Sequence, residues 1–229
     1  MYTIATREFF GLFKSIKSLI IIAILFLASY FSAKYADILL VVGQLSEREA
    51  ENIHSAGLLI LLLLFGLLFI MGLSHDSLNR EIHERTIRFL ITRASRSSIT
   101  VGKFLGIWFF WFVCITISFI LISIYAHKID LFIFSQIMSL LTYQIALTLL
   151  LSMLIPKPGI TMFLGVILGL GFPIVGLWVS FTSNIWLSWT KFLVPYYYLN
   201  QDNYAFLIIL LLAGILLLFT FLMLKRRDC

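Results

Sequence analysis

The stretch SAGLLILLLLFGLLFIMGLS, residues 55–74, contains no Asp, Glu, Lys or Arg. It is as long as the ~20 apolar residues that a helix needs to cross the hydrocarbon of a bilayer. Five more windows of the chain are also free of these four residue types. They are residues 18–33, 104–126, 131–156, 158–190 and 203–224. The pattern predicts six membrane-spanning helices, which we place at residues 18–36, 55–75, 101–126, 131–155, 159–180 and 203–225.

The composition supports the same fold class. Hydrophobic residues make up 61% of the 229 residues and charged residues 12%. A soluble domain of this size could not bury so much apolar surface. The longest charged segment, residues 76–103, is too short for a separate catalytic domain. We therefore expect one all-α integral membrane domain over residues 1–229.

The distribution of Lys and Arg predicts the orientation. With six spans, one face collects 13 basic and 5 acidic residues, and the other collects 4 basic and 6 acidic residues. These counts give net charges of +8 and −2. The basic face should be cytoplasmic, so we expect a multi-pass protein of the cell membrane with both termini inside. The overall charge of +6 is then explained by the membrane topology. We therefore expect no nucleic acid as a partner.

Residues 2–17 show the pattern of a helix that lies on the membrane surface. Apolar residues recur at helical spacing on one face, and Arg7, Gly11, Lys14 and Ser18 occupy the other. Such amphipathic patterning is typical of interfacial helices. The apolar face consists of Ala5, Phe9, Leu12, Phe13 and Ile16. The alternative is a frayed leader before the first span; no cleavable signal pattern is present.

Between the second and third spans, residues 78–92 are helical in character. Oppositely charged residues stand four apart, as in Glu81 and Arg85, and such pairs stabilise helices. Ile87, Leu90 and Ile91 form a small apolar ridge. The serines within residues 95–98 can then cap the N-terminus of the third span. We expect a short amphipathic helix on the inner face of the membrane.

The fifth span and the segment after it are unusual. Gly165 and Gly169 form a G-x-x-x-G pair, which lets another helix approach closely, and Pro173 interrupts the helical hydrogen bonds. This span either serves only to pack against other helices, or it is a kinked helix that lines a substrate pathway. Residues 183–199 are rich in Trp and Tyr, which favour the membrane interface. We expect them to form a re-entrant segment of brief helices that lie at the outer leaflet or dip back into it. The acidic run Glu47, Glu49 and Glu51 is read as solvated outer surface, with a cation-attracting role as the alternative.

Motifs that could carry catalysis are incomplete. His83 and Glu84 begin like H-E-x-x-H, but position 87 is Ile, so the second metal ligand is missing. Ser74 beside His75 lacks the geometry of a nucleophile and its base. Gly102 and Lys103 lack the remainder of a phosphate-binding loop. We therefore predict that the chain is not itself an enzyme and has no catalytic residue, no metal site and no cofactor of its own.

Part of the charged segment resembles the ABC type-2 permease family. Members show Glu-x-Gly-Thr-Leu, two apolar residues, Pro-x-Ser-Arg, and a Gly-Lys that enters the third helix. Two positions depart from this pattern, because Arg85 replaces the usual Gly and Arg93 the usual Pro. The matching residues are Glu84, Thr86, Ile87, Ser95, Arg96, Gly102 and Lys103.

The resemblance implies a type-2 ABC exporter architecture, in which residues 2–17 form an elbow helix and residues 78–92 a coupling helix. Such chains are half-transporters: a second copy or a sister permease completes the membrane domain. A separate cytoplasmic ATPase subunit binds ATP and Mg²⁺ and docks on the coupling helix. The resemblance assigns this docking to Glu84, Arg85, Thr86, Ile87, Arg88, Leu90 and Ile91.

The leading functional hypothesis is therefore the permease subunit of an ABC exporter. An apolar pathway with a few soft polar groups favours an amphipathic peptide or a hydrophobic antimicrobial compound as cargo. The expected pathway and outer-gate residues are Thr142, Gln144, Thr148, Pro173, Tyr196, Tyr197 and Tyr198. Two alternatives remain open: a sodium-exporting ABC permease, and an ion-coupled transporter or channel unrelated to ABC proteins. The second alternative predicts charged residues within the spans. A membrane scaffold or an intramembrane enzyme is disfavoured by the incomplete motifs.

The topology is directly testable by thiol labelling. Cys229 and a Ser95→Cys variant should react with an impermeant thiol reagent only from the cytoplasmic side. Ser95 precedes the third span and Cys229 follows the sixth, and both positions lie on the basic face. A Ser46→Cys variant should react only from outside. Labelling of Ser46→Cys and Cys229 from the same side would contradict the six-span arrangement.

Overall fold

The computed structural model describes residues 1–36, 47–84, 86, 95–182, 189–199, 201 and 204–226. Over these residues the chain is all-α, as predicted. It has six helices that are long and apolar enough to cross a membrane, which confirms the expected number of apolar helices. The protein is therefore of the multi-span membrane class.

The long helices begin and end close to the expected limits, with two differences. α7 begins at Arg96, ahead of the expected start at 101, and α4 begins at Glu47, ahead of the expected start at 55. The long helices are α2 (Ile16–Lys34), α4 (Glu47–Ser74), α7 (Arg96–Ala126), α8 (Leu131–Leu154), α9 (Pro158–Phe181) and α12 (Phe206–Arg226). The short elements are α1 (Tyr2–Phe13), α5 (Asn79–His83), η1 (Trp189–Leu193) and α11 (Pro195–Leu199).

The earlier start of α7 has a local cause. Ser95 is the N-cap of α7, and its side chain accepts a hydrogen bond from Ser98 N at 3.2 Å. This is the cap that the serine-rich segment predicted. Glu47, Glu49 and Glu51 fall in the first turns of α4. The acidic run therefore belongs to a helix and not to an irregular loop.

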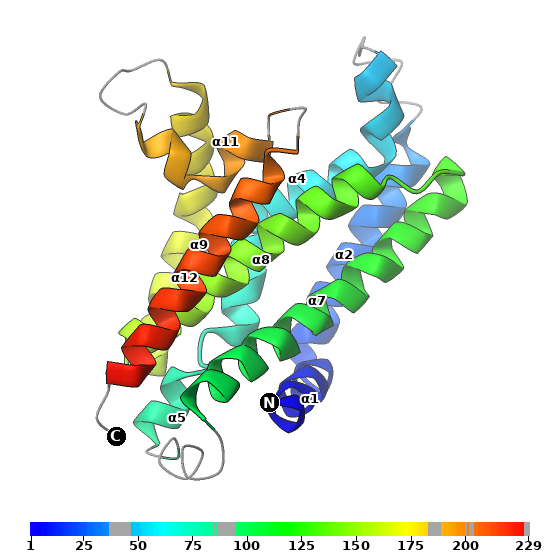
Figure 1. The fold of residues 1–229 in the computed structure, drawn as a ribbon. Helices are drawn as coiled ribbons and strands as arrows, with labels where there is room; N and C mark the ends of the chain where they lie inside the picture. Colours follow the sequence, from blue (N-terminus) through cyan, green and yellow to red (C-terminus); the bar gives the residue numbers. More distant parts are fainter. Residues whose placement is uncertain are drawn as a thin grey trace.

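The N-terminus, α5 and the end of α12 lie at one end of the bundle (Figure 1). We call this the basic end. The N-terminal part of α4, together with α11, lies at the opposite end, which we call the far end (Figure 1). The expected segment 183–199 forms the two short helices η1 and α11 in its described part. Residues 183–188 lie outside the described residues.

α8 is the central helix of the bundle. In its apolar window 72% of residues are buried inside the protein, against 22% in α12. Hydroxyl side chains along α8 donate to carbonyls of their own helix: Thr142 to Met138 O at 2.6 Å and Thr148 to Gln144 O at 2.8 Å. Such bonds satisfy a hydroxyl without a partner on another helix, as an apolar environment requires. Helices α4 and α12 both pack on this central helix.

The glycines of α9 fit it closely against α4. A Cβ on Gly169 would lie 2.8 Å from Leu68 Cα, and one on Gly165 would lie 3.1 Å from Met71 Cβ. Small residues allow helices to approach closely in lipid. The G-x-x-x-G pair thus packs on a helix of the same chain.

The N-terminal segment differs from the expected single helix over 2–17. α1 ends at Phe13, and α2 begins at Ile16 after a break at residues 14–15. The apolar face of α1 packs on α7: Leu12 is buried, and the Phe13 ring lies 4.8 Å from that of Phe110. Ile16, expected on that face, is 77% exposed, because it belongs to the next helix and points in another direction.

Candidate functional site: the junction at the basic end

The N-terminus of α5 is held by a side chain of another helix. Leu78 N and Asn79 N donate to Ser152 Oγ of α8 at 3.0 and 3.1 Å. The first N–H groups of a helix have no partner within it and need an outside acceptor. Ser152 is fully buried. The start of α5 is therefore fixed to α8 by two hydrogen bonds shielded from water.

A second contact joins α5 to α9. Asn79 is fully buried, and its Nδ2 donates to Thr161 Oγ1 at 2.6 Å. Thr161 lies in the first turns of α9, and its hydroxyl also lies 3.2 Å from Lys157 O. An amide–hydroxyl bond between two buried side chains fixes both distance and orientation. α5 thus has separate polar contacts with two of the long helices.

A buried lysine adds the third contact. Lys103 of α7 is 2% exposed, and its Nζ lies 2.7 Å from Glu8 Oε1 of α1 and 2.8 Å from Glu81 Oε1 of α5. A buried ammonium group is tolerated when carboxylates pair with it. The two carboxylates give the cluster a formal charge of −1. One ammonium group therefore ties α1, α5 and α7 together.

Two glycines on α7 let α1 approach the lysine. A Cβ on Gly106 would lie 2.7 Å from Ala5 O and from Glu8 Cβ, and one on Gly102 would lie 3.1 Å from Met1 O. Any side chain at these positions would push α1 away, and with it Glu8. The spacing Gly102-x-x-x-Gly106 was a second small-residue pair in the sequence, and it could have indicated this packing.

Arg96 extends the junction to the last helix. Its Nη1 donates to Leu224 O at 2.8 Å and to Lys225 O at 2.6 Å. The last carbonyls of a helix lack partners within it and carry partial negative charge. The guanidinium group thus caps α12 and joins its end to the start of α7.

Together these contacts make a mechanical junction. α5 is bonded to α7, α8 and α9, and through Lys103 it is linked to α1. Within the described ranges, no group of three or more His, Cys, Asp or Glu could hold a metal ion. What the arrangement can do is pass a displacement of α5 to three long helices at once.

The predicted docking residues fall only partly on the described chain. Glu84 is exposed just after α5, and Thr86 Oγ1 donates to Glu81 O at 3.3 Å. Among the described residues, α5 covers residues 79–83 of the expected helix over 78–92. The other predicted docking residues lie outside the described residues. They are Arg85, Ile87, Arg88, Leu90 and Ile91.

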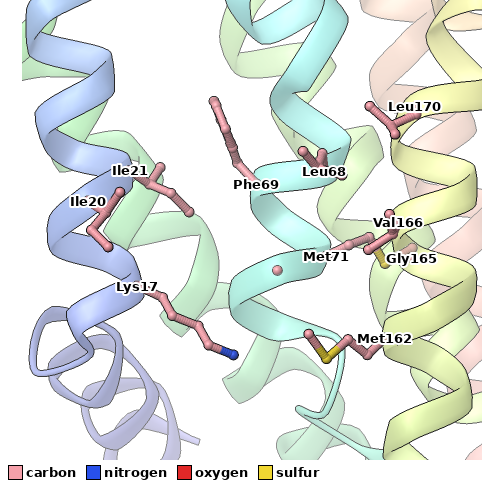
Figure 2. Close-up of a pocket in the computed structure, with 11 residues that line it drawn as sticks. Lys17, Ile20, Ile21, Leu68, Phe69, Met71, Met162, Gly165, Val166 and Leu170 are labelled. Carbon is pink, nitrogen blue, oxygen red and sulfur yellow. The ribbon is translucent and has the colours of Figure 1, made fainter.

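The predicted pathway residues are packed inside the bundle or at its far end. Gln144 is fully buried, and its Oε1 would lie 2.7 Å from a Cβ on Gly66. Thr142 Oγ1 accepts a hydrogen bond from Trp108 Nε1 at 3.0 Å, and Pro173 is buried within α9. None of these side chains lines the groove shown in Figure 2.

The three tyrosines share one short helix, α11. Tyr196 packs on the ring of Phe172 and against Gly176, and Tyr198 Oη donates to Phe192 O at 3.0 Å. Burial raises the pKa of Tyr196 and of Tyr198 above the usual value of a phenol. α11 itself packs on α8, α9 and α12.

A groove of about 490 Å³ opens between α2, α4 and α9 (Figure 2). Its walls are apolar, with Ile20 and Ile21 on one side and Met162 and Val166 on the other. Lys17 extends from α2 toward α4 at its basic end (Figure 2). Sequence reasoning missed this groove, because its walls come from three helices whose exposed faces look alike in a uniformly apolar sequence.

Comparison of the chain with models of known protein families finds no match, and comparison with curated proteins finds none either. The fold and the contacts described above are therefore the basis for any functional assignment.

We predict that Lys103→Met destabilises the protein by about 3 kcal/mol, because Glu8 and Glu81 would face each other with no cation between them. Thermal unfolding of the purified protein in detergent measures the change. Lys157→Met removes an exposed lysine at the same end and should change stability by about 0.5 kcal/mol or less. Equal effects of the two substitutions would contradict a structural role for the buried cluster.

Proposed function

We propose that the chain is the membrane permease subunit of an ATP-driven exporter of the ABC type-2 class. The observation that carries the proposal is the anchoring of α5 to α7, α8 and α9 by buried polar contacts. A short helix at the end of a bundle needs no such anchoring merely to connect two spans. Such a helix needs this anchoring if a force applied to it must reach the membrane-spanning helices.

In this proposal the basic end faces the cytoplasm, as its excess of Lys and Arg indicates. A separate ATPase subunit docks on α5 and on the residues that follow it. Closure of the ATPase pair displaces α5, and the buried contacts convert that displacement into rigid-body motion of the long helices. Packed helices transmit such motion because interiors are nearly incompressible. A second permease, identical or related, completes the transporter.

The groove between α2, α4 and α9 supports an amphipathic or hydrophobic cargo. Its volume of about 490 Å³ lies within the ~300–1,000 Å³ that is usual for ligand sites. Apolar walls offer nothing to a hydrated ion or a sugar, whereas Lys17 offers a cation to an acidic group on an otherwise apolar molecule. An amphipathic peptide or a hydrophobic antimicrobial compound fits this lining.

One observation favours a second candidate, an ion-coupled transporter. The Lys103–Glu8–Glu81 cluster is buried and charged, and buried ionisable groups in membrane helices often serve ion or proton movement. The cluster lies near the start of α7, however, rather than midway along it. Transport that continues after ATP is removed, and stops when an ionophore collapses the ion gradient, would support this candidate over the exporter.

The test of the proposal is copurification with the ATPase subunit. We predict that Ile87→Asp abolishes copurification. The substitution would bury an unpaired carboxylate at the interface with the ATPase subunit, at a cost of roughly 3–5 kcal/mol. Glu84→Lys changes an exposed rim charge and should weaken transport mildly and in a salt-dependent way. Membrane insertion of both variants serves as the control. Full transport by the Ile87→Asp variant would show that the ATPase does not drive the permease through the segment that contains residue 87.

A second prediction separates docking from coupling. Ser152→Ala leaves the N–H groups of Leu78 and Asn79 without their buried acceptor, at a cost of about 1–3 kcal/mol. The docking surface itself is unchanged, so the ATPase should still copurify while cargo moved per ATP hydrolysed falls severalfold.

The matched control is Ser139→Ala. Ser139 is also buried on α8, but its hydroxyl donates only to carbonyls of its own helix. Ser139→Ala should leave both copurification and transport near the wild-type level. If the two alanine variants transported equally well, the contact between α5 and α8 would not couple ATP hydrolysis to transport.

A further inference from the structure

The exposed face of α1 carries a shallow hollow of about 560 Å³, lined entirely by residues between Tyr2 and Lys14. The apolar face of this helix packs on α7 through Leu12 and Phe13, so it is not free to lie on lipid. α1 lies at the basic end of the bundle, beside the start of α7 (Figure 1). The face that carries the hollow is therefore the one that meets the membrane interface.

Two basic side chains flank a gap in this hollow. Arg7 and Lys14 are seven residues apart, which is two helical turns or about 10 Å at 1.5 Å per residue. Gly11 lies four residues after Arg7 and three before Lys14, and these spacings make neighbours on one helix face. A Cβ on Gly11 would meet no atom within 4 Å, so close packing does not require a glycine here. The glycine leaves open space between the two cations.

The positive charge of the hollow is not neutralised by the protein. The Arg7 and Lys14 side chains are exposed, and among the described residues no ion pair involves either of them. The lining contains no Asp or Glu. Glu8, the one acidic residue of α1, is paired with Lys103 on the side that faces α7. The hollow therefore presents two positive charges to an anionic partner.

Exposed aromatic rings border these charges. Phe10 is 55% exposed and Tyr2 is 82% exposed, and both line the hollow. Aromatic side chains at membrane interfaces lie at the level of the lipid headgroups. A small soluble anion would leave both rings in contact with water, whereas a phospholipid brings a phosphate to the cations and hydrocarbon to the rings. The combination of charges and rings thus favours a lipid over a soluble anion.

We propose that this hollow binds one anionic phospholipid of the leaflet at the basic end. Its phosphate lies over Gly11, between Arg7 and Lys14, and its apolar part covers Phe10 and Tyr2. The positive-inside rule puts the basic end in the cytoplasm, and the anionic lipids of that leaflet attract basic side chains near the surface. The site is separate from the groove between α2, α4 and α9, and it is independent of the proposed transport function.

Two sets of variants test the charges and the gap separately. The double variant Arg7→Gln with Lys14→Gln removes both charges and keeps polar side chains. Its matched control is Lys157→Gln, because Lys157 is an exposed lysine at the same end and does not line the hollow. Gly11→Leu fills the gap between the cations. Gly171→Leu is its control, because a Cβ at either glycine meets no atom within 4 Å.

The experiment uses the full chain in detergent with an equimolar mixture of dioleoyl phosphatidylglycerol and dioleoyl phosphatidylcholine. Native mass spectrometry identifies the first lipid retained. Each basic contact is worth about fivefold in affinity, so the wild type should retain phosphatidylglycerol at least about tenfold over phosphatidylcholine. The double charge variant should lose this preference, and Lys157→Gln and Gly171→Leu should keep it. Gly11→Leu should lower retention of phosphatidylglycerol about fivefold.

Three outcomes would overturn the proposal. Equal retention of the two lipids by the wild type would mean that the hollow does not select charge. An unchanged preference in the double charge variant would place the anionic lipid elsewhere on the protein. Displacement of phosphatidylglycerol by excess inorganic phosphate, but not by chloride at equal ionic strength, would make the occupant a soluble anion. Thermal unfolding checks that each variant is folded. If the double charge variant were unfolded, the comparison of Gly11→Leu with Gly171→Leu would decide, and equal retention by these two would reject the site.

Discussion

The burial of the Lys103 ammonium group between two carboxylates is the contact on which the basic end depends. A charge at 2% exposure is unstable unless it is paired, and both of its partners come from short helices that could otherwise detach from the bundle. Glu8 brings α1, and Glu81 brings α5. The same requirement explains Gly102 and Gly106, because α1 must come close enough for Glu8 to reach the lysine.

Among the described residues, α2, α4 and α9 contact one another through close packing and neutral hydrogen bonds. In lipid, apolar burial gives little drive for helices to associate, so close packing and hydrogen bonds must hold them. α9 meets α4 through glycines, and α2 meets α4 where Ser32 Oγ donates to His54 O at 2.9 Å and accepts from Gly57 N at 3.1 Å. Polar groups that pair across helices are therefore concentrated near helix ends, while mid-helix hydroxyls mostly bond to their own backbone.

The sequence was sufficient for the fold class, because charge-free windows of bilayer length allow few alternatives to helices. It also indicated the Ser95 cap, since serine before an apolar run has a local role. It did not reveal the junction, because Lys103, Glu8 and Glu81 are far apart in the chain and each looks like an ordinary interfacial charge. Ser152 was equally hidden: a serine in an apolar helix commonly bonds to its own backbone, and nothing nearby in the sequence indicates that it caps α5.

The central position of α8 connects the two ends of the protein. Ser152, near its basic end, caps α5, and toward the far end Tyr143 stacks on Phe172, which contacts Tyr196 of α11. Gln136 Nε2 also donates to Leu199 O at 3.4 Å. A rigid helix held at both ends cannot shift at one without loading the other. In the proposed exporter, a displacement of α5 along α8 would therefore strain the contacts that hold α11, although none of its three tyrosines lines the groove between α2, α4 and α9.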